Sequence, residues 1–238
     1  MPLTSTFSTI AATQTAADKP LDTTLMDAMR QDIDVLYEWM GGPTYTPSTS
    51  HDHDGINSKA VRSGLIFLAS ATAAASATVD FTSGLSTVYD EYEIHVVNAL
   101  PAVDNDSLYL RIGTGVGPTY ETTLYYWATQ DTDAAGTELN AGGGNVAFVN
   151  ISGSAGVDGA ASNAGFSGVI KCFNPQSTSI DKAFTYSGAF FGTAGDTFHN
   201  LHGAGMRDST SAATAFRLLY AAGNITSGRF YFYGVQRT

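Results

Sequence analysis

The sequence predicts a mainly β protein, in which an N-terminal arm and a short coiled-coil helix precede an antiparallel, jelly-roll-like β-sandwich. Two observations lead to this prediction. Ser (21), Thr (29) and Gly (25) together occupy 75 of the 238 positions, while charged residues make up only 14%, against about 25% in ordinary domains. From residue 64 onward, apolar and polar residues alternate with a period of two, which is typical of half-buried strands.

The composition also excludes several classes of protein. An apolar fraction of 43% is too high for a chain that is disordered throughout. The net charge of −11, with no cluster of Lys or Arg, argues against a nucleic-acid partner. The single cysteine, Cys172, excludes a disulfide framework within the chain. With no secretory signal and no run of about 18 apolar residues, we expect a soluble protein made in a cytoplasm.

Residues 1–20 are small, polar and without periodicity, and Phe7 and Ile10 are their apolar anchors. Two interpretations remain open: a disordered terminus, which is common, or an arm that becomes ordered against a partner.

Residues 21–42 contain the strongest helical signal in the chain. N-cap oxygens at residues 22–24 open the segment, and Gly41, Gly42 and Pro43 end it. Five apolar residues recur at spacings of 3 and 4, as in the seam of a coiled coil: Met26, Met29, Ile33, Leu36 and Met40. The seam can pack on the chain's own β domain or on copies of itself. The arm before the helix and the Pro/Ser/Thr-rich loop after it favour self-association.

Residues 64–238 predict about nine or ten short strands separated by turn-forming clusters. In residues 91–96, Tyr92, Ile94 and Val96 should face one side of the sheet, and Glu93 and His95 the other. The same alternation recurs in residues 107–112. Glycine-, proline- and asparagine-rich clusters at 101–107, 114–119, 131–137, 140–145 and 174–179 predict the turns.

The connector, residues 43–63, includes the unusual segment HDHDGINSKAV at 51–61. In an extended chain, His51 and His53 project to the same side. Two imidazoles are too few for a closed metal site, whereas three chains around an axis would offer six nitrogens, which suit an octahedral transition metal. The alternative is a solvated loop with a turn at Asp54-Gly55.

Other motifs favour structural roles. His199 and His202 in HNLH are spaced to share a face only on a helix, and their surroundings predict a loop or a strand. The acidic stretches 104–107 and 131–133 lack a calcium-loop pattern and predict turns. GTGVG at 113–117 predicts a hairpin, since neither a Lys-Ser/Thr pair nor a helix follows it. Cys172 is expected to be buried as a small hydrophobe, and no pair of carboxylates stands out for catalysis.

Aromatic residues cluster in TYETTLYYWATQ, where Tyr120, Tyr125 and Trp127 are candidates for contact with a receptor or a glycan. An amphipathic ring suits a half-wet contact with a sugar or a neighbouring subunit. Cross-strand aromatic pairing is the alternative.

The order of these segments resembles that of the fibre, spike and appendage proteins of tailed bacteriophages. HDHDGINSKAV resembles the histidine-containing connector that precedes fibre tip domains. The opening TVDFTSGL…YDEYEI and the closing GNITSG…YG resemble a β domain that recurs in phage virion proteins. The resemblance covers roughly residues 22–238.

This resemblance implies a non-enzymatic homotrimer, anchored to the virion by its N-terminus through portal, neck, baseplate or capsid proteins. It also implies a C-terminal domain that is exposed for adhesion to a host glycan or protein. In some fibres, such histidine pairs from three chains bind an iron ion on the axis; here the pair would be His51 and His53. The alternatives are a capsid decoration protein and, with less support, a small glycan depolymerase.

Overall fold

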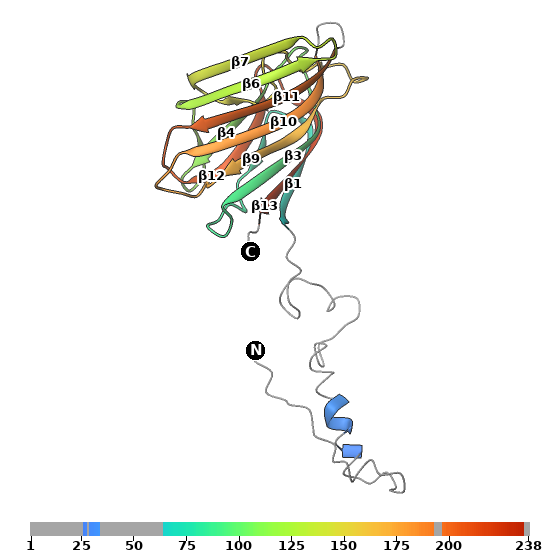
Figure 1. Cartoon of the computed structure of the whole chain (residues 1–238), viewed down its shortest axis with the longest axis vertical. Helices are drawn as coiled ribbons and strands as arrows, with labels where there is room; N and C mark the ends of the chain where they lie inside the picture. The colour runs from blue at the N-terminus through green and yellow to red at the C-terminus, as the bar shows by residue number, and fades with distance from the viewer. Residues whose placement is uncertain (1–25, 28, 34–63, 193–196, 236–238) are drawn as a thin grey trace. The chain divides into compact units, whose positions relative to one another are not determined.

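A computed structural model describes residues 26–27, 29–33, 64–192 and 197–235 (Figure 1). The chain divides into two units, Met1–Arg62 and Ser63–Thr238. The described part of the first unit is helical, and the second unit is mainly β with antiparallel strand pairing. A mainly β fold is therefore confirmed.

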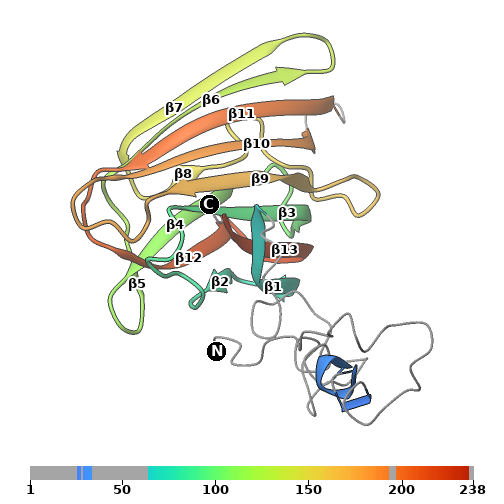
Figure 2. The ribbon, with the colours of Figure 1, turned by 60° about the horizontal axis from the view of Figure 1, so that its bottom comes forward.

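Eight strands form the larger sheet, called here the large sheet (Figure 2). In spatial order they are Leu65–Ser76 (β1), Ile225–Val235 (β13), Glu91–Pro101 (β3), Phe166–Phe173 (β9), Lys182–Gly192 (β10), Thr197–Arg207 (β11), Tyr125–Asp133 (β6) and Glu138–Val146 (β7). All neighbouring pairs are antiparallel.

The smaller sheet contains Val79–Phe81 (β2), Ala213–Tyr220 (β12), Leu108–Thr114 (β4) and Thr119–Tyr120 (β5), and Val149–Asn150 (β8) pairs with β4. The ring of Phe232, from the large sheet, connects the two sheets. It stacks on Phe81 at a centroid distance of 5.1 Å and meets Phe216 edge-on at 5.8 Å. Tyr220 donates its hydroxyl to the carbonyl of Ala99 across the same interior, at 2.6 Å. The two sheets therefore enclose one apolar core, in the manner of a β-sandwich.

Strand pairing is nested along the chain. The first strand pairs with the last, β2 pairs with the next-to-last strand β12, β3 pairs with β9, and β4 pairs with β5. Strands β10, β11, β6 and β7 extend the large sheet beyond this nest. The predicted alternation is confirmed, since Tyr92, Ile94 and Val96 are at most 3% exposed.

Two strands were not predicted from the sequence: β7, which contains the cluster at 140–145 that was predicted to be a turn, and β5, which is too short to leave a pattern. The HNLH segment, for which a loop or a strand was expected, lies inside the strand β11. Strand β7 lies at the end of the large sheet, where only β6 positions its backbone among the described residues. Packing against β6 therefore outweighs the turn preference of its glycines.

A β-bulge interrupts β3 at Asn98. Val97 pairs with Arg229 and Leu100 pairs with Ser227, so β3 carries one residue more than β13 between these two pairs. Asn98 adopts a φ of 53°, a conformation that Asn tolerates better than most residues. Two hydrogen bonds hold it: its N–H donates to the Ser167 hydroxyl at 2.9 Å, and its Oδ1 accepts the Gly165 N–H at 2.7 Å. The bulge leaves Val97 and Asn98 both exposed.

The first unit is described only at Met26, Asp27 and residues 29–33, all of which are helical. Three residues of the predicted seam, Met26, Met29 and Ile33, are 52%, 44% and 60% exposed. Leu36 and Met40 lie outside the described residues, and so do Phe7, Ile10, His51 and His53. Self-association of this helix stays a prediction.

Candidate functional site

The outer face of the large sheet, which points away from the core, carries polar and aromatic side chains on neighbouring strands at its centre. Register places residues of different strands opposite one another on this face. One row runs Phe67, Tyr233, Glu93, Lys171, Thr185, and the next runs Ser70, Tyr231, His95, Val169, Ser187, His202. Because each strand alternates, these residues point away from the buried Ile94 and Phe232.

At the centre of this face, Glu93, His95, Lys171 and Glu91 form what we call the Glu93 cluster. The Glu93 carboxylate, with its side chain 10% exposed, lies 2.7 Å from His95 Nε2 and accepts a hydrogen bond from Lys171 Nζ at 2.7 Å. Glu91 lies 3.6 Å from the same Lys171 nitrogen. Two strands that are distant in sequence, β3 with Glu91, Glu93 and His95 and β9 with Lys171, thus contribute to one charged group.

Two opposing effects set the pKa of Glu93. Burial raises it, but the hydrogen bonds from His95 and Lys171 outweigh burial, so that the pKa lies below its ordinary value. The hydrogen bond to Glu93 in turn raises the pKa of Lys171. A carboxylate held ionised by two donors is a poor general acid near neutral pH. The arrangement is suited to hydrogen-bonding a polar ligand, with charges fixed in place beforehand.

A groove of about 280 Å³ adjoins the cluster. Its lining consists of Val169, Lys171, Thr185, Tyr186, Ser187, His202 and Gly203. Hydroxyl, imidazole and ammonium groups on its walls can donate or accept hydrogen bonds. Groove and cluster share Lys171, so a ligand in the groove would lie against the Glu93 cluster.

Aromatic rings border the cluster on its other side. Phe67 on β1 is 58% exposed and meets Tyr233 edge-on at a centroid distance of 5.8 Å. Tyr233 in turn lies 4.9 Å from the His95 ring. One exposed and one half-buried ring beside fixed hydrogen-bonding groups match the needs of a ligand with both apolar and polar faces, such as a sugar.

The aromatic residues predicted from the sequence to contact a receptor are different ones: Tyr120, Tyr125 and Trp127. Tyr125 is fully buried and accepts the Ile112 N–H at 2.7 Å, and burial raises its pKa to about 12. It is therefore a core residue, and its assignment to a receptor contact was wrong. Its neighbour Tyr126 takes the outward position and is 38% exposed.

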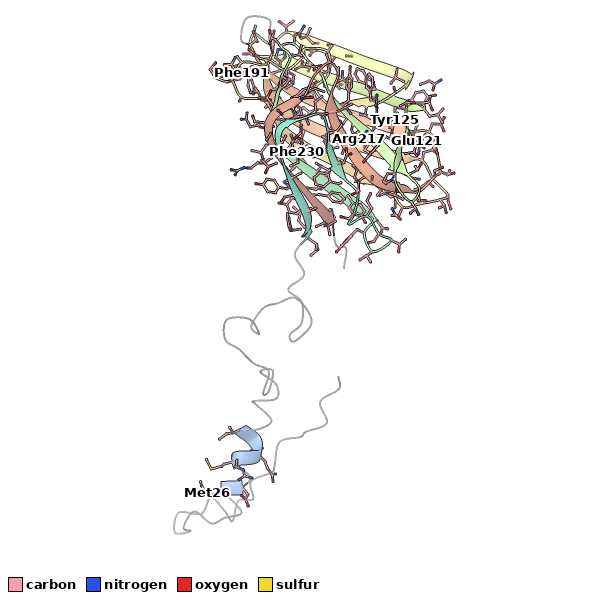
Figure 3. The ribbon with its side chains drawn as sticks, turned by 180° about the vertical axis from the view of Figure 1, so that it is seen from behind. Met26, Glu121, Tyr125, Phe191, Arg217 and Phe230 are labelled. Carbon is pink, nitrogen blue, oxygen red and sulfur yellow. The ribbon has the colours of Figure 1, made fainter. Side chains whose placement is uncertain are left out.

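The other two residues of that set belong to different sheets. Trp127 shares the inward face of β6 with Tyr125 and packs partly against the core. Tyr120 belongs to β5 of the smaller sheet, where the guanidinium of Arg217 lies 3.6 Å from its ring centroid. Figure 3 shows Glu121, Tyr125 and Arg217 on one side of the sandwich and Phe191 towards the other. Because Tyr125 and Trp127 face the core and Tyr120 lies in the smaller sheet, the three candidates do not form one surface.

The HNLH histidines point to opposite sides of β11. His199 is 4% exposed, and its Nδ1 lies 3.0 Å from the Asp131 carboxylate. The ring of Phe190 stacks on that of His199 at 5.2 Å. His202 is exposed and lines the groove. Because successive side chains of a strand point to opposite faces, the two histidines cannot converge on one metal ion. This agrees with the structural role predicted for HNLH from the sequence.

Most of the remaining motifs are structural, as predicted. GTGVG closes the β4–β5 hairpin, with Gly115 and Gly117 at φ of 81° and 77°. Asp133 accepts the N–H groups of Ala135 and Thr137 in a turn. Cys172 is buried, and burial raises the pKa of its thiol. Asp131, predicted to lie in a loop, is instead a buried strand residue.

Among the described residues, no group of three or more His, Cys, Asp or Glu side chains could hold a metal ion. The predicted metal ligands His51 and His53 are outside that range. Within the same part of the chain, no helix is long and apolar enough to cross a bilayer.

Sequence reasoning missed the Glu93 cluster as a unit. Alternation in residues 91–96 placed Glu93 and His95 on one face, but nothing in the sequence placed Lys171 beside them. The pairing of β3 with β9 completes the cluster. This pairing joins residues 78 positions apart, which no local pattern reveals.

No family model matches the chain, and neither the curated proteins nor the solved structures include one that is significantly similar to it.

Proposed function

We propose that this chain is a structural component of a bacteriophage virion, made in the host cytoplasm and assembled as a homotrimeric fibre or spike. Residues 1–20 dock it to portal, neck, baseplate or capsid proteins through Phe7 and Ile10. The sandwich is displayed outward for adhesion to the host surface. The order of arm, heptad helix, histidine connector and β domain supports this proposal.

The outer face of the large sheet provides the main support for a role in adhesion. Its charged groups are already paired, its groove is lined with hydrogen-bonding side chains, and the exposed ring of Phe67 and the half-buried ring of Tyr233 flank it. Such a surface is equipped to hold a ligand rather than to transfer protons to it. Host glycans offer hydroxyls and apolar ring faces, which match these two kinds of side chain.

The nested strand pairing also supports the proposal. Pairing first with last, second with next-to-last, third with β9 and β4 with β5 gives the strand order of a jelly roll. Jelly rolls are common in viral capsid proteins and lectins. A fold alone does not define a function, so this point adds to the outer face rather than standing by itself.

Trimerisation rests on the helix. A short helix is marginal in water unless its apolar side is covered, and Met26, Met29 and Ile33 are all exposed. With Leu36 and Met40 they continue the seam that three chains would bury together. Three connectors would then bring the His51 and His53 pairs of the three chains to one axis, where six imidazoles could bind iron or another transition metal.

Sedimentation of the full chain at micromolar concentration tests this assembly. We expect a trimer, and we expect Ile33→Asp to dissociate it because a charge would enter the seam. Asp27→Asn, an exposed change off the seam, serves as the control and should leave the trimer intact. A stable monomer of the natural chain would contradict the proposal. Elemental analysis finding far less than one metal ion per three chains would remove the metal site.

Imaging of virions with antibodies against the sandwich tests location. Labels at the tail tip or neck support a fibre or spike. Labels spread over the capsid would indicate a capsid decoration protein instead of an adhesive fibre or spike. The absence of label from the virion would overturn the proposal altogether.

A further inference from the structure

Arg229 differs from every other lysine and arginine in the described part of the sandwich, because it has no partner there. Each of the other cations is engaged. Arg111 donates to a backbone carbonyl, Lys171 pairs with Glu93, Lys182 donates to two carbonyls, Arg207 pairs with Glu121 and Arg217 pairs with Asp80. Arg229 is exposed on β13. An unpaired cation is unusual in a chain with a net charge of −11.

Arg229 also lines a groove of about 370 Å³, called here the Arg229 groove. The lining residues are Thr72, Ala73, Val97, Asn98, Ser227, Gly228 and Arg229. This volume lies at the small end of the range for ligand sites, about 300–1,000 Å³. The groove therefore suits one small group, such as a single sugar ring.

The bulge in β3 shapes this groove. Thr72 on β1 and Val97 on β3 lie directly opposite Arg229 on its two sides. The bulge at Asn98 exposes two consecutive residues of β3, and its hydrogen bonds to Ser167 and Gly165 fix it in place. Bulges often redirect side chains beside functional sites. Here the bulge adds an exposed apolar surface, Val97 at 46%, beside the cation.

From this combination we infer that the Arg229 groove binds a carboxylated sugar, with Arg229 pairing the carboxylate. Thr72 and Ser227 supply hydroxyl groups for the sugar hydroxyls, and Val97 supplies an apolar surface for the ring carbons. Tyr231, two residues from Arg229 on the same strand face, offers its ring at the margin. One guanidinium matches one carboxylate charge, whereas a doubly charged phosphate would leave a charge uncompensated.

The inference rests on the proposed adhesive function and specifies its ligand as an acidic unit of a host polysaccharide. It places that unit on the same outer face as the Glu93 cluster. Tyr231 lies opposite His95 in the ladder, so a longer saccharide could extend from the Arg229 groove towards the cluster.

Titration of the purified full chain with sodium glucuronate, followed by NMR or calorimetry, tests the inference. We expect glucuronate to bind the natural chain saturably. Glucose, which lacks the carboxylate, should bind at least about tenfold more weakly. Arg229→Gln should weaken glucuronate binding at least tenfold, and Arg229→Lys should weaken it less. Thr72→Trp should block the groove without altering charge. Arg30→Gln removes an exposed charge from the other unit and should bind as the natural chain does.

Three outcomes would overturn the inference: no saturable binding of glucuronate, equal binding by Arg229→Gln, or equal binding of glucose. Glucose 6-phosphate binding as tightly as glucuronate would overturn the carboxylate assignment. Trimers that adsorb to host cells independently of Arg229 would refute the groove and leave the proposed function standing. Glucuronate binding by a chain that is absent from virions would support the Arg229 groove and refute the proposed virion function.

Discussion

Nδ1 of His199 lies 3.0 Å from a carboxylate oxygen of Asp131, with both side chains in the interior of the sandwich. Burial raises the pKa of Asp131, although the charge and hydrogen bond of His199 act in the opposite direction. The pair joins β6 to β11 beneath the exposed surface. It therefore contributes to the fold, and its stability effect can be measured separately from that of the outer face.

Removing one partner of this pair should be costly. We expect His199→Phe, which keeps an aromatic ring beside Phe190, to lower the free energy of unfolding by about 3 kcal/mol, because it leaves the Asp131 carboxylate buried without its partner. The double variant with Asp131→Asn should lose less than the sum of the single changes. Urea denaturation measures all three. His202→Phe, on the exposed side of the same strand, is the control and should stay within about 0.5 kcal/mol.

Arg217 should matter for stability where Arg229 does not. Arg217 holds both oxygens of Asp80, through Nε at 2.8 Å and Nη2 at 2.6 Å, and its guanidinium covers the Tyr120 ring. Lysine cannot reproduce this fork or the planar stacking. Arg217→Lys should therefore cost about 1 kcal/mol in thermal or urea unfolding. Arg229→Lys, which changes no partner, should cost nothing measurable, and equal losses in the two variants would contradict this assignment.

The Glu93 cluster should make stability depend on pH in the acid range. The pKa of Glu93 lies below its ordinary value of 4.5, so its stabilising effect is complete above pH 4.5 and is lost as the pH falls through the folded-state pKa. Glu93→Gln should lose about 1 kcal/mol at pH 7 and show a smaller further loss on acidification. Urea midpoints at pH 7 and pH 3.5 give the comparison. Glu138→Gln, an exposed change on β7, should follow the natural chain at both values.

Gly168 should tolerate no side chain. A Cβ added there would overlap the carbonyl oxygen of Ser187 and lie 2.8 Å from the Gly188 Cα, both of them backbone atoms of the neighbouring strand. Because β10 would have to move, Gly168→Ala should cost about 3 kcal/mol or more. Gly115→Ala faces open space at a φ of 81°, and should cost only about 1 kcal/mol of backbone strain. Similar urea midpoints for the two variants would refute the packing at β9.

The alternation of residues within single strands could be predicted from sequence, because a period of two depends only on neighbouring positions. Tyr92 and Glu93 are assigned to opposite faces in this way, and the structure agrees: Tyr92 stacks on the core residue Phe232, whereas Glu93 pairs with Lys171 on the outer face. The face of Tyr125 was harder to predict. Leu124 before it has a φ of 66°, and the ladder to β7 shifts register just after it, so that no continuous alternation leads into the strand. A shift of one residue exchanges Tyr125 for Tyr126 at the surface.

The candidate site depended on strand order, which local sequence does not encode. Lys171 meets Glu93 because β9 is placed beside β3, and Arg229 meets Val97 because the last strand is inserted between the first and the third. The bulge at Asn98 likewise requires hydrogen bonds from residues near the start of β9. Only long-range packing sets these placements.

The pairing of β1 with β13 also determines how the sandwich responds to mechanical tension. Leu65, the first residue of β1, lies opposite Val235 at the end of β13. A pull on residue 64 that is directed along β1 loads the ladder from Leu65 to Ser76 together, in shear. A pull directed away from β13 opens the same ladder one hydrogen bond at a time, beginning at Leu65. A displayed domain attached through residue 64 would thus resist a force along β1 better than a force directed away from β13. The direction of the applied force would therefore determine the force at which the domain unfolds.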